Sequence, residues 1–369
     1  MGRRVNRRDG SVAVFVSPHG YGHAARACAV MEALAELEPA MAYEVFTLVP
    51  EWFFTDSLSC PFRYHPLLTD VGLAQTTPTE EDLDETLRQL AAFMPFGDRA
   101  LDDLAEELRG RRCELVIADI SPLGLAAAQR ARIPSVLIEN FTWDWIYEPY
   151  LDRRPVFSGV ITTFAGLFLG AQARIQTEPV CRRDVRWPAV PPVSRAPRAP
   201  RPDVRSRLGL PADAPAVLVT MGGVPWRPDS LEAFEKNDDA FFIVPGASER
   251  VERRGRLVAL PHRSGFFHPD LVHAADAVVG KLGYSTVAET YAAGVPFGHV
   301  GRPTFRESPA LGAFVGAAMP GFPLTSEELA TGEWLRRLPA LLALPRAQGT
   351  RANGAAAAAR IVRGLLTSR

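Results

Sequence analysis

Lysine is nearly missing from this chain of 369 residues, because only Lys236 and Lys281 among its 41 basic residues are lysine. A basic residue placed at random would be arginine, so a lysine within a defined turn is informative. Charge of one sign is also lacking, since the formal net charge is -1 and 22% of the residues are charged. This composition does not predict binding to nucleic acid or to another polyanion.

Cysteine is scarce, and the four cysteines are scattered. They form no C-x-x-C pair, and no histidine stands at ligand spacing from any of them. This argues against structural zinc and for a reducing compartment, so we predict a protein of the bacterial cytoplasm.

Long hydrophobic runs are absent as well. The apolar stretch Val12–Val16 follows a basic start but ends just before Pro18, which is too short for the core of a signal peptide. The longest weakly polar segment, Gly159–Ala173, contains threonines and glycines and is too short to span a bilayer. We predict a buried helix there, with a position on a membrane surface as the alternative.

Apolar strands alternate with helical patterns through both halves of the chain. Val12–Val16 leads through a glycine-rich turn into a helix, and a strand follows at 43–49, which is the pattern of a βαβ unit. Further strands are predicted at 115–118, 135–138, 216–220, 241–244, 257–260, 277–279 and 296–300. Helices are predicted at 327–344, broken near Pro339, and at 355–366.

A proline-rich stretch at 187–202 separates the two halves, because repeated prolines disfavour a helix or a central strand. We predict an N-terminal domain at 1–190, a linker at 191–202 and a C-terminal domain at 203–349. The helix within 350–369 could pack back on the N-terminal domain. The predicted fold class is α/β, with two Rossmann-like, doubly wound domains that face a central cleft.

A strand, a glycine turn and a helix are predicted around Gly280–Glu289, which reads GKLGYSTVAE. The amides and hydroxyls of Ser285 and Thr286 would meet the positive end of the helix dipole, which makes an anion site. Lys281 adds a cation to that site. One turn later the carboxylate of Glu289 could accept hydrogen bonds from the two hydroxyls of a ribose, so a nucleoside diphosphate is predicted.

The alternative for this segment is an ordinary βα turn. In that case Gly283 would only cap the helix, and Glu289 would be solvated.

A second glycine turn, His19–Arg26, follows the first predicted strand, at the edge where open α/β sheets bind their ligands. His23 would stand at the start of the helix, where an imidazole can take a proton from a hydroxyl. A capping or core histidine is the alternative. His19 and His23 could also suggest a metal pair, but two glycines between them disrupt the helix, and no carboxylate or thiolate joins them.

The same turn fits a dinucleotide fingerprint through Gly20, Gly22 and Ala25. The acidic ribose partner that this fingerprint requires is not well placed, since Glu51 comes late and after a proline. A dehydrogenase would also leave the Gly280–Glu289 turn unexplained. A P-loop kinase is excluded by the absence of the G-x-x-x-x-G-K-[ST] pattern.

Asp119 ends the strand predicted at 115–118 and should reach the same edge as His23. A carboxylate on the far ring nitrogen would fix the tautomer and raise the basicity of the imidazole. The alternative is a helix N-cap before Pro122, which Asp119 or Ser121 could supply.

Four blocks of the chain resemble GT-B glycosyltransferases of the MurG-like and plant type. They resemble more closely the glycosyltransferase-like N-terminal domain of L-arabinokinases and its stand-alone relatives. The blocks are His19–Arg26 (HGYGHAAR), Asp119–Pro122 (DISP), Asn140–Tyr147 (NFTWDWIY) and Gly280–Glu289. The aromatic block is the most specific of them.

The resemblance implies acceptor binding in the N-terminal half and donor binding in the C-terminal half. It implies that His23 is the catalytic base, that Asp119 activates it, and that Glu289 binds the ribose. Lys281 and Ser285 stand where the plant-type pattern has histidine and asparagine, so the nucleotide sugar itself is not identified.

Further site residues are predicted with less distinctive patterns. Arg306 and Glu307 could hold the donor sugar, although Ser308 follows where the plant-type pattern has glutamine. Gly222 and Gly223 could admit the diphosphate or form a tight turn. The nucleotide base could be contacted by Leu260, Phe267 and His268. The acceptor could be contacted by His19, Tyr21, Asn140, Trp143 and Asp144. The alternative for both groups is that these side chains pack in the core and bind no ligand.

These predictions combine into a metal-independent, inverting glycosyltransferase that needs no cofactor. It would move a sugar from a nucleoside diphosphate sugar to a hydroxyl or amine of a small molecule, without nucleic acid or integral membrane association. Two alternatives stay open. One is a nucleotide-sugar 2-epimerase on the same fold, and the other is a non-catalytic nucleotide-sugar-binding or regulatory protein.

Overall fold

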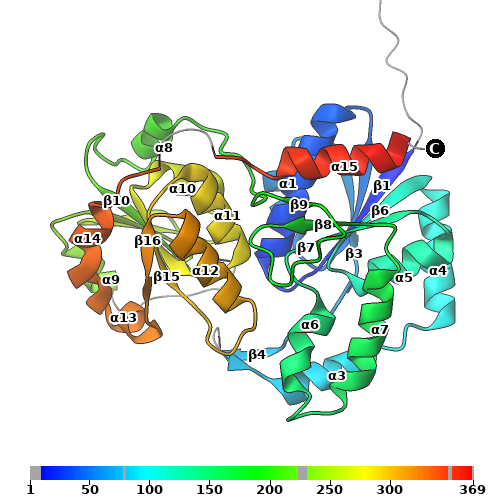
Figure 1. The fold of residues 1–369 in the computed structure, drawn as a ribbon. Helices are drawn as coiled ribbons and strands as arrows, with labels where there is room; N and C mark the ends of the chain where they lie inside the picture. Colours follow the sequence, from blue (N-terminus) through cyan, green and yellow to red (C-terminus); the bar gives the residue numbers. More distant parts are fainter. Residues whose placement is uncertain (1–9, 78–79, 223–230, 348–350, 368–369) are drawn as a thin grey trace, which may run out of the picture. The chain divides into compact units, whose positions relative to one another are not determined.

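The computed structural model describes residues 10–77, 80–222, 231–347 and 351–367. The chain forms two compact units (Figure 1). The first unit is made of Met1–Val193 and Asn353–Arg369, and the second of Ser194–Ala352.

The first unit is built on a seven-stranded sheet in the order β3-β2-β1-β6-β7-β8-β9, and all of its strands are parallel. Chain order reverses between β1 and β6, so the switch point of this doubly wound sheet lies between those strands. The strands are β1 (Ser11–Val16), β2 (Ala42–Thr47), β3 (Phe62–Pro66), β6 (Cys113–Asp119), β7 (Ser135–Glu139), β8 (Ala173–Thr177) and β9 (Ala189–Val190).

Helices cover both faces of this sheet. Apolar side chains of α1 (Tyr21–Leu37), α2 (Glu51–Ser57) and the C-terminal α15 (Ala355–Thr367) form the core on one face. Figure 1 shows α15 alongside α1. The other face packs against α4 (Asp98–Gly110) and α5 (Pro122–Ala131). The remaining elements are β4 (Gln75–Thr77), β5 (Glu80–Glu81), α3 (Leu83–Phe93), α6 (Trp143–Tyr147), η1 (Glu148–Tyr150) and α7 (Phe157–Leu169).

The second unit repeats this architecture with the order β12-β13-β11-β10-β14-β15-β16. Among the described strands of this second sheet, only β12 runs antiparallel to its neighbour. The switch point of the second sheet lies between β10 and β14. The strands are β10 (Ala216–Thr220), β11 (Phe241–Pro245), β12 (Glu252–Arg254), β13 (Leu257–Leu260), β14 (Ala277–Lys281), β15 (Phe297–Val300) and β16 (Gly321–Leu324).

Helices pack on both faces of the second sheet and enclose two apolar clusters. One cluster joins the sheet to α8 (Arg201–Arg207), α10 (His268–Ala274), α11 (Tyr284–Ala293) and α12 (Ser308–Ala318). The other joins it to α9 (Leu231–Glu235), α13 (Ser326–Thr331), η2 (Glu333–Arg337) and α14 (Leu338–Leu342).

The prediction of two doubly wound α/β sheets is confirmed, but five of the strands in these two sheets were missed. These are β3, β8, β9, β12 and β16. Four of them are edge strands, where one side lacks a neighbour and the sequence does not need a continuous apolar run. β12 reads Glu-Arg-Arg and β16 contains a proline, so neither shows the pattern of a buried strand.

Three other segments differ from their predictions. Within the predicted linker, α8 begins at Arg201, because the proline that follows it takes a first-turn position that favours helix initiation. The helix predicted at 327–344 is broken first at Gly332, whose φ of 79° ends α13. The segment predicted as a buried helix forms α7, which buries only Phe157, Phe164 and Phe168.

The described residues contain no helix that is both long and apolar enough to cross a membrane.

Candidate functional site

The switch point of the first unit brings His23 and Asp119 into contact. His23 lies in the first turn of α1, and Asp119 is the last residue of β6. The His23 Nδ1 atom lies 2.9 Å from Asp119 Oδ1, and both side chains are buried. We assign the Nδ1 proton to this hydrogen bond, because an ionised carboxylate only accepts. The unprotonated Nε2 is then the basic nitrogen of the ring.

Gly20 allows the chain to enter α1 at this point. It has a φ of 81°, which is a conformation that L residues rarely adopt, and a Cβ atom there would meet no neighbour. The N-cap residue Gly20 makes no side-chain hydrogen bond to this helix. First-turn amides have no acceptor within their own helix, so those of α1 point out of its N-terminal end beside His23.

Arg26 is a buried partner of the pair that sequence reasoning missed. Its Nε and Nη2 atoms donate to the two carboxylate oxygens of Asp119 at 2.8 and 2.6 Å. Its Nη1 atom donates to Asn140 Oδ1 at 2.7 Å and to Thr177 Oγ1 at 3.3 Å. Arg26 follows His23 by about one helical turn, and this spacing places both side chains on the same face of the helix. Arginine is so frequent in this chain that its presence at this position did not indicate a site residue.

Arg26 keeps Asp119 ionised. Burial alone would raise the pKa of Asp119, but the positive charge of Arg26 and hydrogen bonds from Arg26 and His23 hold that pKa below its ordinary value. An ionised Asp119 can orient His23 and stabilise the imidazolium that forms when the ring takes a proton.

The residues predicted for the acceptor are only partly brought together. The His19 ring packs edge-on against Trp143 at 5.1 Å between centroids, and the His23 ring lies 6.5 Å from the same indole. Trp143 is completely buried, so its indole packs against these rings from the protein interior and is not itself exposed to an acceptor. Asn140 is also buried and binds Arg26. Tyr21 packs instead against aromatic rings of α2.

Asp144 lies elsewhere in the first unit. It lines a cavity of about 550 Å³ together with residues of α7 and of the segment 182–186. Neither His23 nor Asp119 belongs to the lining of this cavity.

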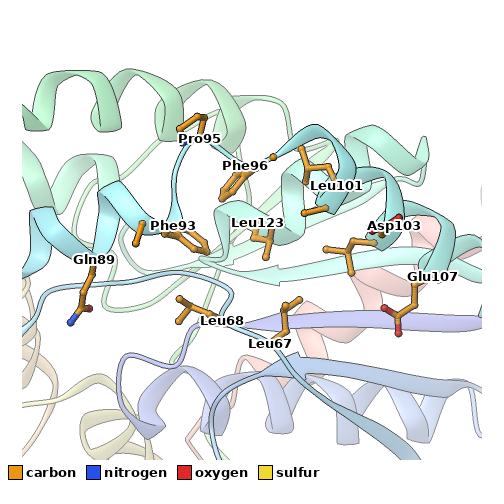
Figure 2. A pocket seen from close by; sticks show the side chains of 14 residues that line it. Leu67, Leu68, Gln89, Phe93, Pro95, Phe96, Leu101, Asp103, Glu107 and Leu123 are labelled. Atoms are coloured by element: carbon orange, nitrogen blue, oxygen red, sulfur yellow. The ribbon is translucent and has the colours of Figure 1, made fainter.

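A larger cavity of about 760 Å³ opens between α3, α4 and the chain that leaves β3 (Figure 2). Figure 2 shows Phe93 and Phe96 on one side of it and Leu67 and Leu68 on the other. The polar side chains of the lining are acidic or amide and include no cation. This cavity suits an apolar group, but none of the predicted site residues that the structure describes lines it.

The second unit forms the predicted strand, turn and helix around Lys281. β14 ends at Lys281, Gly283 precedes α11, and Ser285 and Thr286 lie in the first turn of that helix. The N-cap residue Gly283 makes no side-chain hydrogen bond to α11. The first-turn amides thus point out of the helix beside the lysine, which is the geometry of an anion site.

Lys281 lies near two charged residues of the segment that follows β15. Burial and the nearby charge of Arg302 lower the pKa of Lys281 to about 8, and the charge of Glu307 opposes that fall. Two cations share this place with one carboxylate, which favours binding of a further anion. Glu307 and Arg306 were predicted, whereas Arg302 was missed although it also follows a strand end.

Glu289, the predicted ribose ligand, is buried and holds two side chains. Arg195 donates to its Oε1 atom from Nε at 3.1 Å and from Nη2 at 2.9 Å. The Nδ1 atom of His268 lies 2.7 Å from Oε2. Burial would raise the pKa of Glu289, but the charge of Arg195 and the hydrogen bond from His268 hold it below its ordinary value. A ribose would have to share this carboxylate.

The other residues predicted for the donor lie around the same sheet edge. The Leu260 side chain is part of the core, and its carbonyl accepts a hydrogen bond from the amide of Gly246. The Phe267 ring contacts the guanidinium groups of Arg195 and Arg198 at 5.0 and 4.4 Å. Gly222 follows β10 with a φ of 69°, which favours glycine. Gly223 lies outside the described residues.

No group of three or more histidine, cysteine, aspartate or glutamate side chains in the described part of the chain is placed to hold a metal ion.

No protein-family model matches the chain. An L-arabinokinase of Arabidopsis thaliana is 29% identical over 360 residues, which cover 95% of this chain. The chain spans only 34% of that relative's length.

Solved structures give a second comparison. The UGT89C1 protein of Arabidopsis thaliana in complex with UDP has a TM-score of 0.63 at 14% identity, over 97% of this chain and 99% of that one. The spinosyn forosaminyltransferase SpnP has a TM-score of 0.61 at 15% identity, over 97% and 94%. The glycosyltransferase VinC in complex with dTDP has a TM-score of 0.59 at 17% identity, over 96% and 95%. These similarities confirm the predicted resemblance, and the chain has the GT-B fold of such glycosyltransferases.

Proposed function

We propose that this protein is a glycosyltransferase that moves a sugar from a nucleoside diphosphate sugar to a hydroxyl, or an amine, of a small molecule. The observation that carries the proposal is the buried His23–Asp119 pair at the switch point of a GT-B unit. The turn at Lys281, at the switch point of the other unit, supports the assignment of the donor diphosphate.

Each proposed role follows from the position of the residue. The Nε2 atom of His23 takes the proton of the acceptor hydroxyl, while Asp119 holds the ring in the required tautomer. Lys281 and the first-turn amides of α11 stabilise the negative charge that develops on the departing diphosphate. Because these groups supply the charge stabilisation, we propose that the transfer needs no metal ion. Attack by an activated hydroxyl opposite the leaving group inverts the anomeric centre.

Release of nucleoside diphosphate tests the proposal directly. The purified chain is incubated with a panel of nucleotide sugars, with and without hydroxyl-bearing small molecules, in the presence and absence of EDTA. A glycosyltransferase releases diphosphate only when the acceptor is present, and we expect EDTA to change nothing. Conversion of the donor without acceptor would indicate the 2-epimerase. Nucleotide-sugar binding without either reaction would indicate the non-catalytic protein.

Lys281 should make nucleotide affinity depend on pH. Because its pKa in the free protein is lowered to about 8, the ammonium group loses its proton as the pH rises through this value. Binding of UDP must then take up a proton, and affinity should fall by up to about tenfold per pH unit above that point. Calorimetry in two buffers of different ionisation enthalpy measures this uptake, which should grow towards one proton at pH 9.

Lys281→Arg should abolish the proton uptake, because arginine stays charged throughout this range. Lys236→Arg is the matched control, since Lys236 is the other lysine and lies exposed on the surface beside Glu232. Uptake that persists in Lys281→Arg would remove Lys281 from the diphosphate site.

Glu289→Gln tests the ribose assignment. If Glu289 accepts a hydrogen bond from the 2′-hydroxyl, the unmodified protein should bind UDP about tenfold more tightly than 2′-deoxy-UDP, because hydrogen bonds to charged groups are strong. This ratio should fall severalfold in Glu289→Gln, because a neutral amide oxygen accepts a weaker hydrogen bond than a carboxylate does. Glu307→Gln, which changes another buried carboxylate of the same unit, should keep the ratio. An unchanged ratio in Glu289→Gln would leave Glu289 as an anchor for Arg195 and His268 only.

A further inference from the structure

Asp70 is a fully buried carboxyl group beside the His23–Asp119 pair that the proposed reaction does not use. It lies in the segment that leaves β3. Ser17 Oγ donates to Asp70 Oδ1 at 3.0 Å, and Trp143 Nε1 donates to Asp70 Oδ2 at 3.1 Å. One side chain thus joins the end of β1 to the start of α6.

Ser17 and Trp143, the two side chains that donate to Asp70, are in turn in contact with the turn and the residues of the proposed catalytic pair. Ser17 donates its backbone amide to the carbonyl of Asp119 at 3.3 Å, and its hydroxyl accepts from the His19 amide at 3.3 Å. The indole of Trp143 packs against the His19 ring and lies 6.5 Å from the His23 ring. Asp70 therefore binds both the turn, through Ser17, and the indole that packs against this turn, through Trp143.

Neighbours of Asp70 fix the segment in which it lies. The hydroxyl of Thr69 donates to the carbonyl of Val16 at 2.6 Å. The Tyr147 hydroxyl donates to the carbonyl of Gly72 at 2.7 Å. Gly72 has a φ of 67°, and a Cβ atom there would lie 2.6 Å from the His19 ring. Only glycine lets this segment pass so close to the turn.

The charge on Asp70 changes near neutral pH. Burial raises the pKa of Asp70 to about 7, hydrogen bonds from Ser17 and Trp143 oppose the rise, and the negative charge of Asp119 adds to it. The titratable groups around it are Asp119 on β6, with its partners His23 and Arg26 on α1, together with His19 on the turn and Tyr147 on α6.

We propose that Asp70 is a positioning residue for the transfer, a role that rests on the proposed function. Its two oxygens hold Trp143 and the Ser17–His19 turn in the arrangement that presents His23 to the acceptor. A loosened turn misplaces the base by a fraction of an ångström to an ångström, and such displacements lower rates by up to about 10²-fold. Donor binding in the other unit is not affected.

Asp70→Asn tests this role with kinetics. The variant keeps the shape of the side chain but turns one acceptor into an NH₂ donor, which cannot satisfy both Ser17 and Trp143 in their present roles. We expect kcat to fall ten- to 100-fold while the Kd of UDP changes by less than twofold. The step near pH 7 that Asp70 contributes to the kcat profile should also vanish. Glu44→Gln, which neutralises a buried carboxylate on β2 that is bonded to Arg63 and His65, should retain kcat and profile.

Trp143→Phe provides a second variant, because it removes the indole donor and keeps an aromatic ring. It should lower kcat like Asp70→Asn. The double variant should lose no more than either single one, since both changes break the same hydrogen bond. Additive losses, or an unchanged kcat in both single variants, would overturn the proposal.

Nuclear magnetic resonance gives a readout that does not need activity. The indole ¹H–¹⁵N signal of Trp143, assigned with Trp143→Phe, should shift with a midpoint near pH 7 in the unmodified protein and in Glu44→Gln. It should not titrate in Asp70→Asn. A signal that is insensitive to pH in the unmodified protein and unmoved by Asp70→Asn would show that Asp70 does not hold Trp143. If no transfer is detected for any donor, the proposed function fails, while this measurement still decides the role of Asp70.

Discussion

Replacement of His23 by alanine is expected to lower kcat by about 10²- to 10⁴-fold, which is the usual contribution of a positioned general base. The Kd of UDP, measured by calorimetry, should change by less than twofold, because the residues proposed to bind the nucleotide belong to the other unit. Initial-rate kinetics with a saturating donor measure the loss. The variant should remain folded, since His23 is a partner of Asp119 but Arg26 keeps that carboxylate paired.

His65→Ala is the matched control for this variant. His65 also lies in the first unit and also contacts a buried carboxylate, with its Nε2 atom 2.7 Å from Glu44 Oε2. It belongs to an edge strand and not to the switch point. We expect it to keep kcat. Equal losses in the two variants, or a parallel loss of UDP binding in His23→Ala, would make His23 a structural residue.

Asp119→Asn should have the second large effect, because it acts on activity and on stability together. An asparagine at this place cannot stabilise the imidazolium of His23, so we expect kcat to fall by on the order of 10²- to 10⁴-fold. It also leaves the buried guanidinium of Arg26 without its carboxylate. Loss of one partner from such a pair destabilises a protein by about 3–5 kcal/mol. Urea unfolding and steady-state kinetics measure the two effects separately.

The pH dependence of this stability difference has a definite sign. The pKa of Asp119 is lowered in the folded protein, so its contribution to stability is present above the ordinary value of about 4. The contribution is lost as the pH falls through the folded-state pKa. The unmodified protein should therefore lose its advantage over Asp119→Asn in acid. A stability difference that stays constant down to pH 3 would show that folding does not lower the pKa of Asp119.

The contact between His23 and Asp119 could be predicted from sequence, because parallel strands end at one edge of a sheet. A strand before His23 and a strand ending at Asp119 place both residues at this edge whatever the intervening elements are. The turn at Lys281 followed in the same way from an apolar strand and a glycine. Patterns that lie within a few consecutive residues carried these predictions.

The partners of these residues could not be predicted. Arg195 reaches Glu289 from a proline-rich segment 94 residues earlier in the chain. Asp70 lies in a polar, turn-rich segment, and its partners Ser17 and Trp143 are 53 and 73 residues away. Neither residue stands at a spacing that marks a motif. Their roles depend on contacts between segments that are far apart in the chain. Such contacts cannot be inferred from the local patterns of a single sequence.

The course of the chain between Val193 and Asn353 makes the second unit an insert within the first. The amide of Gly354 donates to the carbonyl of Pro192 at 3.0 Å, so the chain leaves and re-enters the first unit at one place. A short peptide is enough to join these neighbouring points directly. Joining residues 193 and 353 in this way would give a shortened protein that contains the whole first unit, including α15. Truncation before residue 353 would instead remove α15, whose side chains form part of the core of that unit.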